Sequence, residues 1–275
     1  MDKSRQSFAK RSKVSKQRVE MFLKLTDNIE TVRMNHPRMG LRKIFYKESL
    51  FEHIGVNQFE TYFITKGYGV VRKKSQIRTT NSRFSERYYD NLINGLVMNR
   101  INQLIVGDIT YYITRDWTYY CCFLVDVYSL RIVGYSVDIN MRTELCMRAM
   151  RMVVKTRGKQ NIKEMIHHTD KGSQYGSIIY SDNLKKNQLQ ISMAENCLEN
   201  GYAERINGII KEEYLDFEQL KNLKQMKKAL AKSVKLYNEE RPIKRHGYLT
   251  PIEFENGVKP KTKQVNEFKL HDFRT

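Results

Sequence analysis

The sequence predicts an α/β fold, with a mixed five-stranded sheet preceded by a small helical region. Three β-branched and aromatic-rich runs follow one another between residues 104 and 137, and helical and strand-like runs alternate from there to residue 237. Before residue 72 the apolar residues recur only at helical spacing. This order of elements predicts one sheet with helices packed on it and a separate helical unit ahead of it.

The first 71 residues predict a helical, helix-turn-helix-like DNA-binding region. Residues 1–16 are basic and lack apolar periodicity, which is typical of a mobile arm or of the remnant of a longer upstream segment. Three short helices with a tight glycine turn fit a helix-turn-helix, whose last helix can enter the major groove. A small helical bundle that only packs on its neighbour is an equally good interpretation. We expect the helices at residues 17–35, 41–49 and 57–65, with Asn57 as a possible N-cap and Gly67 as a stop.

The excess positive charge is concentrated in the N-terminal part of the chain. The 275 residues include 49 Lys and Arg against 30 Asp and Glu, and 12 of the 19 excess charges lie in residues 1–100. Such a surplus attracts polyanions such as nucleic acid. Residues 72–99 begin with a polar, basic, unperiodic stretch, which predicts a linker that binds phosphates through Arg72, Lys73 and Lys74.

The predicted sheet and its helices occupy residues 100–255, and residues 256–275 are expected to be a basic tail. The expected strands are 104–106, 119–127, 130–137, 162–168 and 190–193. The expected helices are 142–156, 177–187, 198–215 and 218–237. Three strands followed by helix–strand–helix–strand–helix is the order of an RNase H-like sheet.

Three acidic residues occupy positions that could bring them to one point. Asp108 and Asp170 each end an apolar, strand-like run, and Glu204 lies on a predicted helix. In an RNase H-like sheet the first and fourth strands are neighbours, so the aspartates would be adjacent with the helix packed across them. Three carboxylates supply the hard oxygen ligands that Mg²⁺ or Mn²⁺ prefers, and paired divalent metals act on phosphodiesters. Taken singly, each acid also fits an ordinary surface or turn residue.

Residues near these acids are candidates for DNA contacts. Lys211 lies two turns beyond the third acid on the same helical face, where its ammonium could meet a phosphate. Gln174 and Tyr175 follow Asp170 in a predicted flexible loop and could touch the scissile strand or simply order the turn. Arg205 could bind DNA or be an ordinary solvated charge.

Other polar residues are predicted to be architectural. His167 and His168 are neighbours on a strand and point to opposite faces, so structural packing is the better interpretation. Asp126 and Arg131 bracket a strand turn and could pair with each other. The four cysteines form no CxxC or Cys/His cluster, which argues against a zinc site and predicts reduced thiols in a cytoplasmic protein. No apolar stretch approaches 18 residues, so no membrane span is expected.

Five sequence frames together carry a family resemblance. They are Asp108-Ile-Thr-Tyr, Asp126-Val-Tyr-Ser-Leu-Arg-Ile-Val-Gly-Tyr, His168-Thr-Asp-Lys-Gly-Ser-Gln-Tyr, Ala203-Glu-Arg-Ile-Asn-Gly-Ile-Ile-Lys-Glu-Glu-Tyr and Tyr237-Asn-Glu-Glu-Arg-Pro. They resemble the IS3 family of insertion-sequence transposases, whose catalytic domain is similar to retroviral integrase. The likeness is strong over residues 102–255 and weaker over residues 1–70. It implies a DDE recombinase in which Asp108, Asp170 and Glu204 hold two Mg²⁺ ions, with Mn²⁺ as a substitute.

The sequence departs from the family pattern in two places. Ile105 replaces the usual tryptophan, a packing change with little bearing on catalysis. The 33 residues between Asp170 and Glu204 make a slightly shorter gap than usual, and the missing residues fall in a loop at 194–198. Glu195 and Glu199 are therefore rival third ligands, although the frame around Glu204 matches the family better.

The resemblance implies a transposase that cleaves and joins DNA strands by in-line phosphoryl transfer. Transposon ends and target DNA are the implied substrates, and the implied partners are further copies of the chain on DNA and an upstream-reading-frame DNA-binding segment. One alternative is a DNA-binding regulatory or assembly subunit whose RNase H-like domain is not itself active. Another is a nuclease that acts on RNA–DNA hybrids. The intact acidic trio argues against the first, and the N-terminal region with its basic linker argues against the second.

Overall fold

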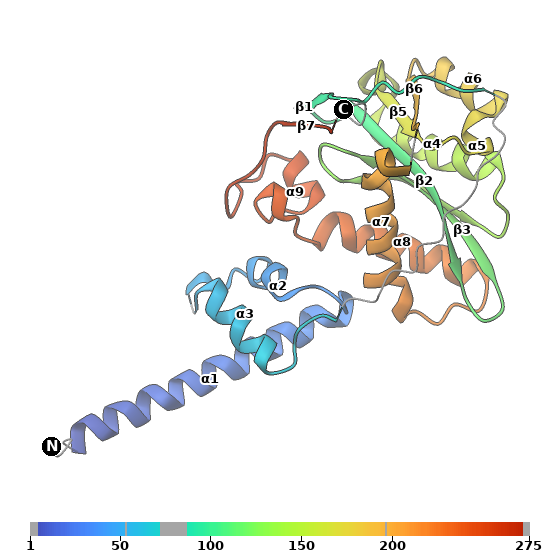
Figure 1. The fold of residues 1–275 in the computed structure, drawn as a ribbon. Helices are drawn as coiled ribbons and strands as arrows, with labels where there is room; N and C mark the ends of the chain where they lie inside the picture. The colour runs from blue at the N-terminus through green and yellow to red at the C-terminus, as the bar shows by residue number, and fades with distance from the viewer. Residues whose placement is uncertain (1–4, 53, 72–86, 196, 272–275) are drawn as a thin grey trace. The chain divides into compact units, whose positions relative to one another are not determined.

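The computed structural model describes residues 5–52, 54–71, 87–195 and 197–271, and the chain divides into two compact units, 1–72 and 73–275. The first unit packs three helices around an aromatic and aliphatic core that includes Ile29, Ile44 and Phe59 (Figure 1). Its helices are α1 (Arg5–Asn35), α2 (Leu41–Lys47) and α3 (Val56–Thr65), with a 3₁₀ turn at Leu50–Glu52.

Two local predictions for this unit are wrong. The first helix begins at Arg5, so residues 5–16 are helical and do not form a mobile arm. This stretch lacks Gly and Pro and is rich in good helix formers, so it needs no apolar periodicity to form a helix. The N-cap of α3 is Gly55, one residue before the helix, and not Asn57. Gly67, with a φ of 84°, follows the end of α3 as expected.

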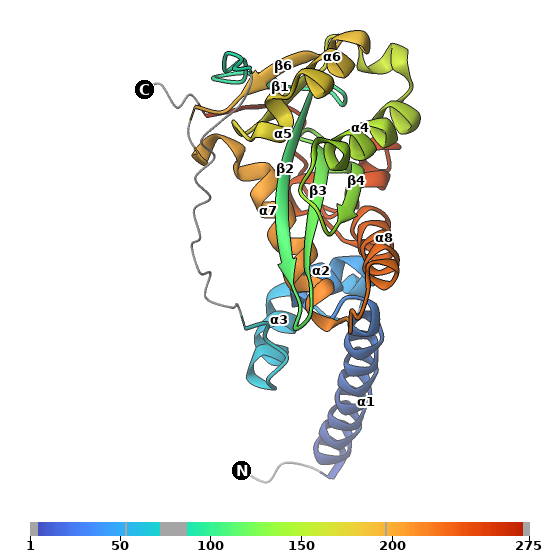
Figure 2. The ribbon, with the colours of Figure 1, turned by 90° about the vertical axis from the view of Figure 1, so that its right-hand side faces the viewer.

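The second unit contains a mixed five-stranded sheet in the order β4-β3-β2-β5-β6. β2, β3 and β4 are antiparallel neighbours, whereas β5 runs parallel to β2 and β6 runs parallel to β5. The strands are β2 (Leu104–Ile113), β3 (Thr118–Asp126), β4 (Ile132–Asp138), β5 (Ile166–Thr169) and β6 (Gln190–Met193). This is the predicted RNase H-like topology, and Figure 2 shows β2 and β3 as its long antiparallel pair.

Helices cover both faces of this sheet, which explains the almost continuous apolar run of β3. One face, with Val106 and Phe123, packs against α7 (Gly201–Glu213) and α8 (Leu223–Glu240). The other face, with Ile105 and Leu124, packs against α4 (Thr143–Arg157), α5 (Ser173–Gly176) and α6 (Ile178–Lys186). α7 crosses the centre of the sheet beside β2 (Figure 1), and the candidate active site described below lies at this crossing.

Several predicted boundaries differ from the structure. β2 continues to Ile113, so Asp108 lies within the strand and not at its end. β5 begins only at Ile166, because residues 159–162 form a 3₁₀ turn. α8 begins after Asn222, whose side chain caps it by accepting the Gln225 N–H at 2.9 Å, and not at residue 218.

Parts of the predicted linker and tail pack on the catalytic unit. β1 (Val97–Met98) pairs antiparallel with β7 (Phe268–Lys269), and the N–H of Leu270 donates to the Leu96 carbonyl at 2.8 Å. The short helix α9 (Pro251–Glu255) precedes β7. Arg72, Lys73 and Lys74 lie outside the described residues. Among the helices that are described, none is both long and apolar enough to cross a membrane.

Candidate active site

Asp108 and Asp170 lie side by side on one face of the sheet. β2 and β5 are parallel with Gly107 beside Thr169, so the next register position places Asp108 beside Asp170. Alternation along β2 puts Asp108 on the face of Val106, which is the face that α7 covers. The backbone N–H of Gly172 donates to Asp170 Oδ1 at 3.1 Å, which orients this second carboxylate.

α7 presents a polar stripe to β2. Residues 200, 204, 207 and 211 share one side of the helix because side chains three and four positions apart lie above one another. Three of the four hydrogen-bond to β2, while Glu204, between them, is exposed. The bonds are Asn200 Nδ2 to Gly107 O at 3.0 Å, Asn207 Nδ2 to Asp108 Oδ2 at 2.6 Å, and Lys211 Nζ to Thr110 Oγ1 at 2.9 Å.

The site carries more negative charge than its own cations balance. Burial, together with the neighbouring carboxylates of Asp170 and Glu204, raises the pKa of Asp108 to about 7, although Lys211 opposes the shift. Burial also raises the pKa of Asp170. A cation is therefore the ligand that this cluster favours.

The donor set fits a hard divalent cation, since all three side chains are carboxylates. The pKa of Asp108 is raised by burial and by the nearby acids Asp170 and Glu204, so a cation bound beside it would offset the cost of its charge. Across the described residues, no three acidic, histidine or cysteine side chains converge closely enough to hold a metal as they stand. The exposed Glu204 side chain would therefore have to move toward the aspartates for all three to share an ion.

The two rival third ligands are placed differently. Glu199 is buried and accepts hydrogen bonds from Asn91 Nδ2 and from the backbone N–H of Glu195, both at 2.7 Å. Glu195 is exposed on the loop after β6. The charges that act on Asp108 include Glu204 but neither rival. These positions favour Glu204.

One predicted DNA contact is wrong. Residues 173–176 form the helix α5, where a flexible loop was expected. Tyr175 is buried, only 2% exposed, with its hydroxyl 3.7 Å from the Cys122 sulfur, so its ring fills the core and cannot contact a DNA strand. Gln174 is partly exposed and its Nε2 donates to the Met141 carbonyl at 3.1 Å.

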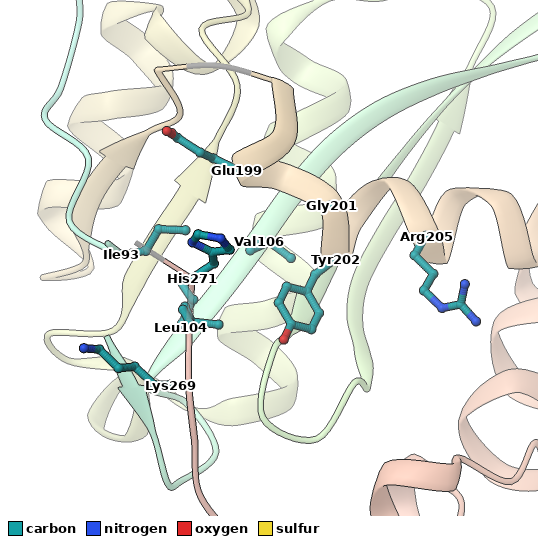
Figure 3. Close-up of a pocket in the computed structure, with 10 residues that line it drawn as sticks. Ile93, Leu104, Val106, Glu199, Gly201, Tyr202, Arg205, Lys269 and His271 are labelled. Atoms are coloured by element: carbon teal, nitrogen blue, oxygen red, sulfur yellow. The ribbon is translucent and has the colours of Figure 1, made fainter. Parts of the chain in front are cut away.

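A pocket of about 310 Å³ lies beside the N-terminal end of α7 (Figure 3). Its wall includes Leu104 and Val106 of β2, on the same face as Asp108. Tyr202 and Arg205 line it from α7, and Lys269 and His271 line it from the C-terminal segment. Since successive helical residues are about 100° apart, Arg205 leaves α7 in a different direction from Glu204. Arg205 therefore borders this pocket, while Glu204 belongs to the polar stripe.

The two histidines have the structural role that was expected. Tyr180 Oη lies 2.9 Å from His167 Nε2, and Ser192 Oγ lies 2.8 Å from His168 Nδ1. Burial lowers the pKa of His167 to about 3 and that of His168 to about 4, so both are neutral at physiological pH.

Asp126 and Arg131 pair through their backbones, with the Asp126 N–H donating to the Arg131 carbonyl at 3.0 Å, but their side chains have other partners. Asp126 is buried and accepts backbone N–H groups from Asn102, Tyr128 and Ser129. Arg131 instead pairs with Glu255 of α9 at 2.6 Å. The described cysteine side chains are free and buried, as expected for Cys121 and Cys122.

The sequence-based interpretation missed two sets of polar residues. Asn207 was not singled out, although its position three residues after Glu204 places it on the same helical face. The Tyr237-Asn-Glu-Glu-Arg frame was used only for its family likeness, yet its side chains hold the helices to the sheet. Tyr237 Oη donates to Leu130 O, Asn238 bonds both the N–H and the carbonyl of Ile132, and Arg241 makes two 2.7 Å bonds to Glu213.

Comparison with known proteins identifies the family of this chain. Residues 98–196 and 186–251 both match the family described as integrase core domain. The chain is 32% identical over 225 residues to the transposase for insertion sequence element IS629 of Shigella sonnei, covering 80% of this chain and 75% of that protein. It is 30% identical over 136 residues to the transposase for insertion sequence IS3A of Escherichia coli K12, covering 48% and 46%. The chain belongs to the IS3 family of insertion-sequence transposases.

Among solved structures, the chain is similar to the HTLV-2 integrase catalytic core domain in complex with magnesium. The two are 20% identical, with a TM-score of 0.46, and the match covers 60% of this chain and 99% of that one.

Proposed function

We propose that this transposase cleaves and joins DNA strands at Asp108, Asp170 and Glu204. The observation that carries the proposal is the pair of adjacent aspartates, with the pKa of Asp108 raised to about 7 by burial and neighbouring acids. A partly buried pair of like charges is costly to the fold, and such pairs are characteristic of functional sites. The basic chain supplies the complementary attraction for a polyanionic substrate.

We assign two Mg²⁺ ions to these carboxylates, and Mn²⁺ as a substitute. When bound, the ions activate the attacking oxygen and stabilise the leaving oxygen of an in-line displacement. Asn207 holds the Asp108 carboxylate, and the Gly172 N–H holds that of Asp170. Lys211, fixed by the Thr110 hydroxyl, places a positive charge beside the acids where a DNA phosphate would lie.

The N-terminal region is proposed to bind transposon ends. Most of the excess positive charge lies in residues 1–100, and residues 1–71 include a three-helix unit with its own core. Residues 72–99 begin with the basic stretch that contains Arg72, Lys73 and Lys74. On the catalytic unit, exposed Arg205 and partly exposed Gln174 are proposed to contact the substrate strand. We further propose that several copies of the chain act together on DNA, with an upstream-encoded DNA-binding segment as a possible additional component.

The test is a metal-dependent assay on linear DNA with and without the inverted-repeat ends of the element. We expect nicking at the ends and joining of the freed 3′-OH to a second DNA, both dependent on Mg²⁺ or Mn²⁺. Binding without cleavage under all metal conditions would favour a regulatory subunit. Cleavage confined to RNA–DNA hybrids would favour a nuclease. Either result would contradict the proposal.

A further inference from the structure

The short hydrogen bond between Asn207 and Asp108 links the polar stripe of α7 directly to the acidic cluster. Asn207 is 4% exposed, and its Nδ2 donates to Asp108 Oδ2 at 2.6 Å. Its other amide atom, Oδ1, is buried and has no hydrogen-bond partner among the described residues. The amide therefore makes one bond at the site, and that bond is to a carboxylate.

The carboxylate fixes which way the amide faces. An ionised carboxylate only accepts hydrogen bonds, so a reversed amide would set two acceptor oxygens against each other. The bond holds Asp108 by one oxygen, Oδ2, and leaves lone pairs of the other oxygen for a cation. Because the amide is uncharged, it orients the carboxylate without neutralising the negative charge that attracts the metal. A lysine or arginine at position 207 would orient the group but also compete with the cation.

Asn200 provides an internal comparison. It lies on the same side of α7, is 3% exposed, and also has a buried Oδ1 without a partner in the described structure. Its Nδ2 donates to a backbone atom, the Gly107 carbonyl, at 3.0 Å. The two asparagines therefore share burial and donor chemistry, Asn200 at the N-cap of α7 and Asn207 within it, and differ in whether the acceptor is a proposed metal ligand.

We infer that Asn207 is a positioning residue that holds the Asp108 carboxylate in the orientation a divalent cation requires. The inference rests on the proposed function, because it takes Asp108 to be a metal ligand. Hydrogen bonds to ligating side chains fix their orientation, and loss of such a bond typically lowers metal affinity or activity by about 10- to 100-fold. Asn207 would thus set how tightly the site holds its metal, without touching the metal or the DNA.

The experiment compares Asn207→Leu with Asn200→Leu in the full chain. Leucine has the same branched shape as asparagine and removes the donor, and because it is the larger side chain, the matched change at position 200 controls for its bulk. Mn²⁺ binding, followed through the electron paramagnetic resonance signal of the free ion, reports metal affinity without any catalytic turnover. We expect Asn207→Leu to bind Mn²⁺ about 10- to 100-fold more weakly, and Asn200→Leu to change the affinity by less than about threefold. A thermal melt without metal monitors folding, and Asn207→Ala serves if the leucine variant does not fold.

Equal weakening in both variants would overturn the inference, because it would mean that any disturbance of α7 affects the metal. Unchanged affinity in a folded Asn207 variant would overturn it as well. Failure of the unmodified chain to bind Mn²⁺ at all, or unaltered binding by Asp108→Asn, would instead contradict the proposed function. The two failures are therefore distinguishable.

Discussion

α7 and α8 cover the same face of the sheet, and both carry buried polar side chains, yet their polar groups are satisfied to different degrees. On α8, the side chains of Tyr237, Asn238 and Arg241 all have hydrogen-bond partners. On α7, the amide oxygens of Asn200 and Asn207 have no partner among the described residues, and the acid that Asn207 contacts has a strongly raised pKa.

The difference separates polar groups that stabilise the fold from polar groups that prepare a site. Buried polar groups with all their bonds made hold the structure together, whereas incompletely satisfied ones cost stability. α8 therefore anchors the catalytic unit at Ile132 of β4 and at Glu213 of α7. α7 holds Asn207 against Asp108 of β2, a carboxylate whose charge is costly where it lies and would be offset by a bound cation under the proposed function. Four changes test this contrast.

The largest expected effect is on catalysis. Asp108→Asn, Asp170→Asn and Glu204→Gln should each reduce strand cleavage and joining by more than about 1,000-fold, roughly 4 kcal/mol in activation free energy. The amides keep the size of the side chains but lose the charge that the metals need. DNA binding, measured by gel shift, should be largely retained. Substantial activity in Glu204→Gln together with an inactive Glu199→Gln or Glu195→Gln would show that the third ligand was misassigned.

The next effect is on stability at α8. Arg241→Ala leaves the Glu213 carboxylate without its bidentate partner, and breaking a buried ion pair in this way costs about 3 kcal/mol. We expect the loss in urea unfolding of the full chain. Lys235→Ala, which breaks an exposed pair with Glu239 on the same helix, is the control and should change stability by less than about 0.5 kcal/mol. Similar values for both variants would contradict the anchoring role of α8.

A gain in stability is expected at α7. The pKa of Asp108 is about 7 in the folded protein against an ordinary 3.8, so the folded state binds the extra proton and loses stability as the pH rises from 3.8 to 7. Asp108→Asn removes this cost and should be more stable than the unmodified chain by about 2 kcal/mol at pH 8 without metal. The gain should shrink at pH 5.

The control for this prediction is the metal itself. Mg²⁺ at pH 8 should stabilise the unmodified chain and not the variant, since a ligand stabilises only the protein that binds it. Thermal melts in chelator and in Mg²⁺ at both pH values provide the measurement. A variant that is less stable than the unmodified chain at pH 8 would refute the view that Asp108 strains the fold.

The smallest expected effect concerns Lys211. Lys211→Met keeps the length of the side chain and removes its charge, and we expect single-turnover cleavage at saturating DNA to slow about tenfold, roughly 1.4 kcal/mol. Thr110→Val removes the hydroxyl that holds the ammonium and should slow cleavage by a smaller factor. An unchanged rate in Lys211→Met would reduce this residue to a structural partner of Thr110 and Tyr111.

The adjacency of Asp108 and Asp170 could be predicted from sequence because each aspartate follows a strand-like run and the two strands are neighbours in this topology. The roles of Asp108, Asp170 and Glu204 in catalysis stay predictions. The topology followed from the order of elements, and β6 was predicted without error. The length of β2 was missed because the strand carries polar and aromatic residues from Asp108 onward. Apolar and polar residues no longer alternate regularly there, so the sequence pattern does not indicate a strand. Tyr175 was misassigned because the turn of α5 is too short for a periodic signal, so nothing in the sequence shows that its ring points inward.

The α7 contacts were harder to predict for a different reason. The spacing of Asn207 and Lys211 from Glu204 follows from helix geometry, but their partners lie on a strand about 100 residues earlier. Which β2 residue faces which helical residue depends on how the helix crosses the sheet. That crossing is set by packing of the apolar side chains and not by local sequence.

The pairing of β1 with β7 joins two segments of the catalytic unit that are synthesised at very different times. Val97 and Met98 lie at the beginning of this unit, while their partners Lys269 and Phe268 lie far along the chain. The chain between β1 and β7 forms a long loop, and closing it costs conformational entropy before the strand contacts can form and stabilise it. During synthesis, Ile93 and Met98 emerge well before Leu270, which belongs to the same apolar cluster. A segment that is synthesised long after residue 93 thus completes the apolar cluster begun there.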